Sequence, residues 1–214
     1  MKQLLTMLAL MWLTGCATQA PYNYSAFKAA NPRSVLILPP NNHSPDVNAP
    51  SAVLAQMTRP IAEAGYYVIP VTLMEASFRE NGVYSGAEAQ AINIKKLHEI
   101  FAADTALYTD ITEYGNTYRL ISAETAVTLR AKLVDLRTGI TLWEGSARAS
   151  SSEQNNNSGG GLAGLLIQAA VQQVVNQLAD NSYTFAGIAS TRLLTPSPNG
   201  LLYGPRSPKY QPGK

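Results

Sequence analysis

The chain has 214 residues and a mass of 23.0 kDa, which is the size of one ordinary domain or of one domain with tails. Apolar residues make up 46% of it and charged residues only 14%, against about 25% in a typical soluble protein, so disorder of the whole chain is excluded. The net charge of +2 is too balanced for a nucleic-acid binder, and the single cysteine excludes an internal disulfide.

The N-terminus has the pattern of a secretory signal. Lys2 precedes residues 4–13, an apolar run broken only by Thr6, and this run is about half of the ~20 residues that span a bilayer. The tetrad Leu-Thr-Gly-Cys at 13–16 resembles the lipobox of bacterial lipoproteins. We therefore expect a signal peptide at 1–15, cleaved between Gly15 and Cys16, and acylation of Cys16 with diacylglycerol and palmitate. The alternative is a buried free cysteine behind a chance apolar run.

The residues after Cys16 predict how the protein is held. Several acyl chains anchor a protein stably, and Ala17, in place of Asp, favours the outer membrane by resemblance to the known sorting rule. We expect the domain to face the periplasm, with surface exposure left open. Residues 16–33 contain Pro21 and Pro32 and no apolar period, which predicts a lipid-anchored tether. An α/β domain at 34–194 and a Pro-rich C-terminal tail at 195–214 follow.

The first half of the domain has the order of a βαβ unit. Residues 34–38 are a short apolar run before two prolines, which predicts a buried strand. A helix is expected over 51–64, with Ser51 as N-cap and Gly65 as its stop, and a second strand over 66–71. Further helices are expected at 74–80 and 87–102, the latter from apolar residues at helical spacing, and a third strand at 105–112.

The period changes to two in the second half. Residues 117–135 alternate, a turn signal follows at 135–139, and 140–149 returns as a partner strand. Helices are expected over 162–179 and 183–194. The predicted fold class is α/β (α+β), with a single mixed sheet, an early βαβ unit, a C-terminal antiparallel hairpin and helices packed on the sheet.

Few residues are candidates for chemistry. His43 and Asp46 lie in the loop 41–50 after the first strand, where a His–Asp pair could position a base; the alternative is an exposed loop histidine. His98 lies next to an apolar helix stripe and is expected at the core boundary. Because there are two isolated histidines and no cysteine beyond Cys16, we expect no metal site and no cofactor.

Two glycine motifs fall short of catalytic ones. In residues 82–86 the serine is one place too late for a nucleophile elbow. The glycines at 159–161 precede an expected helix but lack the Gly-Lys-Ser/Thr ending of a phosphate-binding loop, so a hinge is the interpretation. We therefore expect no catalytic residues and no enzyme.

Residues 154–179 contain no charged side chain. As a helix they would carry an apolar stripe on one side and amides on the other, and charge depletion is typical of the core of a protein–protein interface. A core helix with a polar outer face is the alternative, and membrane insertion is disfavoured because amides are costly in lipid. The candidate interface residues are Leu162, Leu165, Gln168, Gln172, Gln173 and Asn176.

The C-terminal residues 200–210 mix aromatic residues, prolines and cations. This composition allows a peptide arm that lies over a partner, an arm that lies over its own domain, or a disordered tail.

Four stretches carry a family resemblance: VLILPPNN at 35–42, EAGYYV at 63–68, KLVDLRTG at 132–139 and LLYGPRSPKY at 201–210. Together with the lipobox they resemble a family of outer-membrane lipoproteins of unknown function in Gram-negative bacteria. That family is similar in fold to the N-terminal domain of the Tol-system protein TolB and to curli-secretion-type lipoproteins. The resemblance implies a mixed α/β domain, self-association and a role in an envelope assembly, and it supplies no catalytic residues.

The sequence thus favours a non-enzymatic outer-membrane lipoprotein that acts as an interaction component of an envelope transport or assembly complex. We expect a membrane partner through the lipid anchor, a homo-oligomer and partner envelope lipoproteins, and no nucleic acid. The alternatives are a small-molecule or glycan binding module beside the loop 41–50 and, less favoured, an envelope hydrolase that uses the His43 loop.

Overall fold

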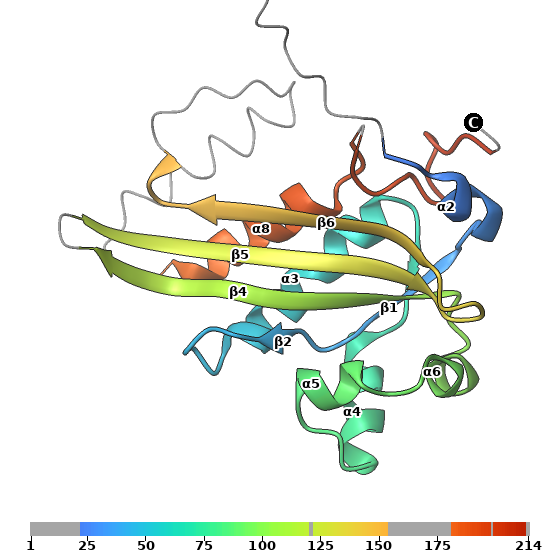
Figure 1. Cartoon of the computed structure of the whole chain (residues 1–214), viewed down its shortest axis with the longest axis horizontal. Coiled ribbons are helices and arrows are strands. Elements are labelled where there is room, and N and C mark those ends of the chain that lie inside the picture. The colour runs from blue at the N-terminus through green and yellow to red at the C-terminus, as the bar shows by residue number, and fades with distance from the viewer. Residues whose placement is uncertain (1–21, 120–121, 154–180, 198, 213–214) are drawn as a thin grey trace, which may run out of the picture.

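The computed structural model describes residues 22–119, 122–153, 181–197 and 199–212. They form one mixed six-stranded sheet, in the order β3-β1-β4-β5-β6 with β2 paired to β4, and α3 and α8 pack on one face of it (Figure 1). This confirms the predicted fold class. The strands are β1 (Ser34–Ile37), β2 (Asn41–Asn42), β3 (Tyr67–Val68), β4 (Thr105–Arg119), β5 (Ser122–Asp135) and β6 (Thr141–Ser150). The helices are α2 (Ser25–Ala30), α3 (Ala49–Glu63), α4 (Val71–Glu80), α5 (Gly86–Gln90), α6 (Ile94–Phe101) and α8 (Ser182–Leu194).

The early βαβ unit forms as predicted from β1, α3 and β3, with β1 parallel to β3 on one side and to β4 on the other. The prediction of Ser51 as N-cap is wrong: Asn48 occupies that position, and Pro50 lies in the first turn, where its fixed φ suits a helix start. Gly65 follows the helix with φ +99°, a left-handed conformation that ends the helix as expected.

The second predicted strand is shorter than expected. Only Tyr67 and Val68 pair in β3, and the residues up to 71 do not continue it. Pro70 is the N-cap of α4, which begins at Val71 rather than at Met74. Since proline has no N–H to donate to a strand ladder, the strand ends and the helix starts earlier.

The helix predicted over 87–102 is two helices. Ser85 caps α5 through a capping box with Glu88, and the side chain of Asn93 accepts a hydrogen bond from the Lys95 N–H at the start of α6. An N-cap inside an apolar pattern restarts the helix in a new direction. The apolar spacing of 94–101 is still used, since Leu97 is fully buried.

The antiparallel hairpin of β5 and β6 is confirmed, but the boundaries of its strands differ from the prediction. The expected strands 105–112 and 117–135 are instead β4, which runs on to Arg119, and β5, which begins at Ser122 and pairs with β4. Both strands alternate in hydrophobicity, so periodicity does not reveal where the chain reverses. A register shift between Ile111 and Glu113 marks a bulge in β4.

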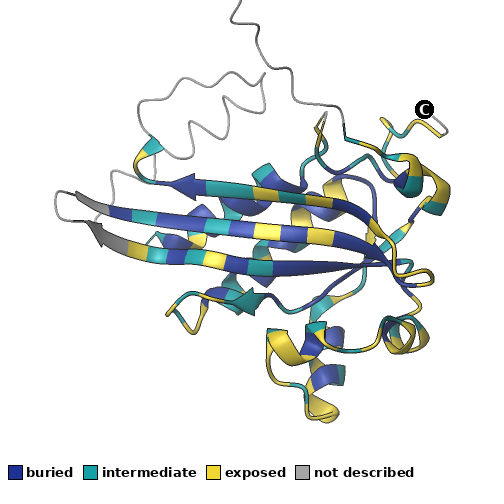
Figure 2. Ribbon diagram, in the orientation of Figure 1, coloured by how far each residue is buried: buried dark blue, intermediate teal, exposed yellow. Residues whose placement is uncertain are grey.

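The core lies between the sheet and the helices α3 and α8. Figure 2 shows buried residues alternating with intermediate and exposed ones along β5 and β6, as expected for a sheet with one covered face. Helix α8 agrees with the predicted 183–194 helix, whereas the predicted 162–179 helix lies outside the described residues. The largest fully buried side chains include Trp143, Phe185, Met57, Leu107, Ile111 and Leu129.

The two ends of the described chain lie together at one end of the molecule (Figure 1). Helix α2 precedes β1, and Phe27 on it is buried in the core. Residues 199–212, here called the C-terminal strap, contain no helix or strand but pack against the same region, with Leu201 buried. Of the three alternatives for this segment, the arm over its own domain is the one that forms. No described helix is long and apolar enough to cross a membrane.

Candidate functional site

A groove of about 540 Å³ opens where β1 ends. Its walls come from the residues after β1, the first turn of α3, helix α4 and the start of α5. In α/β folds ligands bind at the carboxyl ends of strands, where neighbouring connections leave the sheet in opposite directions. Strand β1 has that position, since α3 leads from it to β3 while β4 pairs on its other side.

The groove has an apolar floor and an exposed rim. Leu54 and Phe78 line it and are 4% and 5% exposed, and Phe78 packs edge-on against Phe101 at 5.5 Å between ring centroids. The rim residues Val47 and Tyr84 are 86% and 77% exposed. Large apolar side chains held in water beside an apolar floor are typical of a surface that binds a partner or ligand.

The backbone of the groove is fixed by close contacts. Gly86 lies against the carbonyl group of Pro40 so closely that a Cβ would overlap it. The Gln90 side-chain amide donates to the carbonyl oxygens of Pro39, at 3.1 Å, and Thr109, at 2.8 Å. These contacts join α5 to β4 and to the residues after β1, so the groove is built before any ligand arrives.

His43 and Asp46 have different partners in the structure, and His43 is an exposed loop histidine, the second of the two interpretations. The Nε2 atom of His43 lies 3.4 Å from Asp110 Oδ1 and 3.1 Å from the Asn41 amide nitrogen. The Asp46 carboxylate instead accepts a hydrogen bond from the Asn48 N–H at 2.8 Å, because it closes the turn before α3. His43 is half exposed and does not line the groove.

His98 is half-buried at the core boundary, as predicted. Its Nδ1 atom lies 2.9 Å from the carbonyl oxygen of Ala103, so this ring nitrogen has a hydrogen-bond partner within the protein. Within the described ranges, no three His, Cys, Asp or Glu side chains are grouped as metal ligands.

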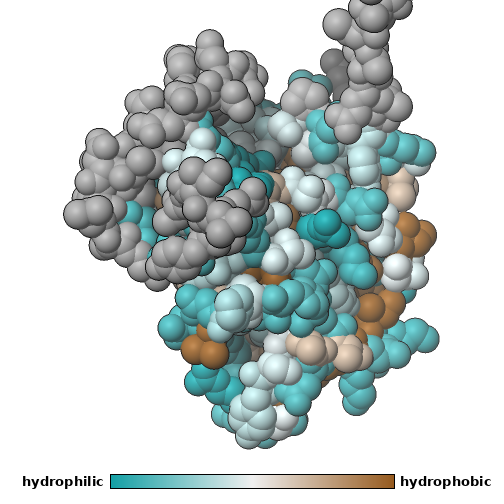
Figure 3. All heavy atoms as spheres, turned by 60° about the vertical axis from the view of Figure 1, so that its left-hand side comes forward, coloured by the Kyte–Doolittle hydropathy of each residue, from teal (hydrophilic) through white to brown (hydrophobic). Residues whose placement is uncertain are grey.

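The sheet face opposite α3 and α8 is polar. Tyr108 and Asp110 of β4 pair across the sheet with Lys132 and Arg130 of β5, and the Lys132 ammonium lies 5.3 Å from the centroid of the Tyr108 ring. Charges of both signs alternate across this face, which is typical of a solvated sheet surface. Figure 3 shows another side of the molecule, on which hydrophilic residues predominate among those drawn in colour and apolar residues form small patches.

Arg148 on β6 organises the far part of that face. Its guanidinium contacts Glu113 Oε2 at 3.1 Å and Glu124 Oε1 at 2.6 Å, and the Ser152 hydroxyl donates to Glu124 at 2.7 Å. The Ser152 and Arg148 hydrogen bonds outweigh the cost of burial and lower the pKa of Glu124 to about 2. This network stabilises the end of the sheet and favours the ionised form of Glu124.

The C-terminal strap binds the opposite end of α3 from the groove. The N–H groups of Gly204 and Arg206 donate to the carbonyl oxygens of Ala64, at 2.8 Å, and Gly65, at 3.0 Å. Tyr66 donates from its hydroxyl to Leu202 O at 2.7 Å. Sequence reasoning missed these contacts, because residues at such separations leave no signal in a single sequence.

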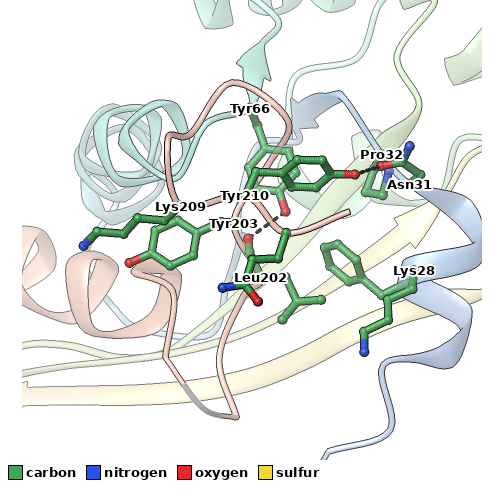
Figure 4. A pocket seen from close by; sticks show the side chains of 10 residues that line it. Lys28, Asn31, Pro32, Tyr66, Leu202, Tyr203, Lys209 and Tyr210 are labelled. Atoms are coloured by element: carbon green, nitrogen blue, oxygen red, sulfur yellow. Dashed lines mark hydrogen bonds between the residues drawn. The ribbon is translucent and has the colours of Figure 1, made fainter. Parts of the chain in front are cut away.

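The strap also holds the N-terminal segment. Tyr24 donates to the carbonyl oxygen of Gly200, and the Tyr210 hydroxyl lies 2.6 Å from Asn31 Oδ1. Figure 4 shows Tyr66, Tyr203 and Tyr210 around a pocket of about 290 Å³ between α2 and the strap. The segment that leads toward Cys16 is therefore fixed to the domain at residues 22–31.

The remaining predicted site residues lie outside the described residues. These are Cys16 with Gly15, and the candidate interface of Leu162, Leu165, Gln168, Gln172, Gln173 and Asn176. They stay predictions.

The described residues thus form one mixed α/β domain, with a preformed groove at one end and both ends of the described chain at the other. The chain matches the family model described as "Putative lipoprotein GNA1162-like" over residues 22–206 and belongs to this family. The resemblance predicted from the four sequence stretches is thus confirmed, and a membrane-anchored lipoprotein is the class to which the chain belongs.

Related proteins agree with this assignment. The chain is 44% identical over 212 residues to "Putative lipoprotein NMB1124/NMB1162" of Neisseria meningitidis serogroup B, covering 98% of each chain. It is 44% identical to the crystal structure of lipoprotein GNA1162 from Neisseria meningitidis, which matches 68% of this chain and 100% of that chain with a TM-score of 0.55. The PelC dodecamer from Paraburkholderia phytofirmans is 11% identical, over 77% of this chain and 88% of that chain, with a TM-score of 0.43. At that score the likeness bears on neither the fold nor the assembly of this chain.

Proposed function

We propose that the protein is a non-enzymatic outer-membrane lipoprotein that acts as an interaction component of an envelope transport or assembly complex. In this proposal the signal peptide 1–15 is removed, Cys16 carries the lipid including palmitate, and the domain faces the periplasm. The lipobox and the membership of a lipoprotein family support the anchor. The candidate interface at 162–176 and self-association belong to the same proposal.

The observation that carries the proposal is that the groove and the C-terminal strap lie at opposite ends of α3. The first turn of this helix lines the groove, and the residues directly after it hold the C-terminal strap beside the tethered segment. Fifteen residues of helix separate the two ends by about 22 Å. A domain held by its tether at one end of α3 thus has its groove turned away from the anchor, toward a partner.

The groove chemistry favours a protein partner. Tyr84 is an exposed aromatic residue of a type enriched among those that dominate binding energy at interfaces, and Val47 adds exposed apolar surface to the same groove. Glu75 and Arg79 add both signs of charge at the wall, as in the polar rim around an interface core. The fitting occupant is an apolar segment of a partner envelope lipoprotein or of a second copy of this chain.

The test is crosslinking from the groove in intact envelopes. A photoreactive benzoylphenylalanine at position 84 should give a discrete protein adduct, whereas the same residue at Tyr183, 54% exposed on α8, should not. Adduct formation should fall when Val47→Ser is added. The mass of the adduct separates a second copy from a different lipoprotein. No adduct at position 84, together with a clean monomer in light scattering, would contradict the proposal.

A second candidate is a small-molecule or glycan binding module in the same groove. The volume of about 540 Å³ is within the range of ligand pockets, and an aromatic rim beside polar side chains suits a sugar ring. Titration calorimetry with neutral oligosaccharides separates the two functions. Binding that is lost in Tyr84→Ser and kept in Tyr183→Ser would favour this candidate. Heats indistinguishable from those of dilution into buffer would favour the protein partner instead.

A further inference from the structure

The end of the domain that holds the tether is rich in exposed cations. Helix α2, the turn after β5 and the C-terminal strap contribute them from parts of the chain far apart in sequence. All five side chains belong to exposed residues. These residues, here called the basic end, are Lys28, Arg33, Arg137, Arg206 and Lys209.

A chain of contacts joins these cations into one surface. Arg206 lies over the ring of Tyr67 at 5.1 Å, and the Tyr67 N–H donates to the carbonyl oxygen of Arg33. Arg137 donates to the carbonyl oxygen of Ala30 in α2 at 3.2 Å. Lys28 and Lys209 lie on opposite sides of the pocket between α2 and the strap (Figure 4).

The carboxylates at this end are already engaged. Asp104 accepts hydrogen bonds from the N–H groups of Arg33 and Ser34. Asp135 is buried and binds the N–H groups of the turn as well as Arg137. Glu63 pairs with Arg59 at 2.7 Å. A further carboxylate, Glu144, lies near Tyr22. The cations at this end still outnumber the carboxylates near them, so the basic end keeps a positive potential toward the solvent, which attracts an anionic surface.

Tyrosines gather at the same end. Six of the eleven in the chain lie shortly before α2, shortly after α3 and in the strap, and all of them except the buried Tyr66 are partly or fully exposed. Tyrosine is enriched where proteins meet the membrane–water interface, because its ring is apolar and its hydroxyl is polar. The six are Tyr22, Tyr24, Tyr66, Tyr67, Tyr203 and Tyr210.

The tether keeps this end close to the membrane. Tyr22 is six positions after Cys16, and at ~3.3 Å per position the chain between them reaches at most about 20 Å. A domain held this closely has few orientations, and the one that places cations on the headgroups is favoured because each Lys or Arg near an anionic leaflet is attracted to it.

We propose that the basic end lies on anionic phospholipid headgroups of the membrane that holds Cys16. The inference rests on the proposed anchoring through Cys16 and deepens it, because it fixes which face of the domain meets the membrane. The lipid contacts are electrostatic, so they weaken when salt shortens the Debye length.

The experiment uses the lipoprotein purified from membranes and reconstituted into vesicles. Since the single cysteine of the chain is acylated in this account, an added cysteine is the only free thiol. A fluorophore is attached at Gln211→Cys in the strap or, as control, at Tyr84→Cys in the groove. The vesicles contain lipids with a quencher on the headgroup, which lowers the fluorescence when the labelled position touches the membrane. They are made of phosphatidylcholine with or without phosphatidylglycerol.

We expect quenching at position 211 to exceed that at 84 several-fold when phosphatidylglycerol is present. The excess should vanish at about 1 M salt, where the Debye length is ~3 Å, and in Lys28→Gln with Lys209→Gln. The matched pair Arg130→Gln with Lys132→Gln removes two exposed charges elsewhere and should keep the excess. Equal quenching at both positions, or an excess unchanged in the Lys28/Lys209 variant, would overturn the inference.

Flotation with pure phosphatidylcholine vesicles tests the lipid anchor separately from the orientation of the domain. Protein that floats yet shows equal quenching leaves the lipid anchor standing and overturns only the orientation. Protein that does not float overturns the anchoring and this inference with it.

Discussion

The hydroxyl of Tyr66 donates a hydrogen bond of 2.7 Å to the carbonyl oxygen of Leu202, 136 positions further along the chain. Tyr66 lies directly after α3, and burial raises the pKa of its phenol. The bond therefore fastens the C-terminal strap to the protein core. Because the strap in turn holds α2, the position of α2 depends on the far end of the sequence.

Removing this bond should loosen the strap. We expect Tyr66→Phe to lower the free energy of unfolding by about 1–2 kcal/mol, since the carbonyl oxygen of Leu202 loses its partner. Urea denaturation measures the loss, and faster hydrogen exchange at 200–210 localises it. Tyr183→Phe, at an exposed position, is the control and should change neither. Unchanged exchange in Tyr66→Phe would contradict the fastening role of this bond.

The close approach of Gly65 to the strap predicts a larger effect. A Cβ at Gly65 would lie 2.7 Å from Ser207 Cβ and 2.8 Å from the Gly204 carbonyl oxygen, at φ +99°. We expect Gly65→Ala to cost about 3 kcal/mol, from overpacking and left-handed strain, and to expose the strap to proteases.

Gly82 supplies the matched control for this substitution. It also has positive φ, at +75°, but nothing lies within 4 Å of its added Cβ. Gly82→Ala should therefore cost only about 1 kcal/mol from backbone strain. Equal losses of stability in the two variants would show that the strap does not press on Gly65.

The Arg148 network predicts an acid-dependent stability. Since the pKa of Glu124 falls from an ordinary 4.5 to about 2 in the folded protein, its contribution is full above pH about 4.5. It is lost as the pH falls from there toward about 2. Glu124→Gln should cost about 3 kcal/mol at neutral pH and flatten the pH dependence in that window. Glu63→Gln, in an exposed i,i+4 pair, should change stability by less than about 1 kcal/mol. A wild-type slope retained in Glu124→Gln would contradict the assignment.

The wall of the groove depends on Gly86. Its added Cβ would overlap the carbonyl group of Pro40 and lie 2.9 Å from the Asn41 nitrogen. We expect Gly86→Ala to cost about 2 kcal/mol, because the backbone on both sides must move apart, and to reduce the crosslink from position 84. Thermal unfolding and crosslink yield measure the two effects, and a full yield in Gly86→Ala would show that the groove shape is not used for binding.

The sequence predicts best what periodicity and turn chemistry encode. The apolar run of β1, the helix stop at Gly65 and the turn at 135–139 follow from local patterns, and the structure confirms them. The break between α5 and α6 is missed because the apolar spacing continues across it. The extension of β4 is missed because two alternating strands in succession read as one.

The candidate site depends more on long-range contacts than on local pattern. A cleft beside residues 41–50 is anticipated from the loop after β1, but its apolar floor of Leu54 and Phe78 comes from helices whose packing no local pattern gives. His43 finds Asp110 on a neighbouring strand rather than Asp46 nearby. The strap is recognisable in the sequence as a proline-rich segment. Its docking against Ala64 and Gly65 depends on tertiary contacts that only the structure shows.

The central claim is that Cys16 carries the lipid that anchors the domain. Metabolic labelling with palmitate, followed by membrane fractionation, compares the wild type with Cys16→Ser. The account predicts a labelled wild-type protein in the outer membrane, and a Cys16→Ser protein that is unlabelled and either released or left as the precursor. Continued labelling of Cys16→Ser, or an unlabelled wild type, would contradict it.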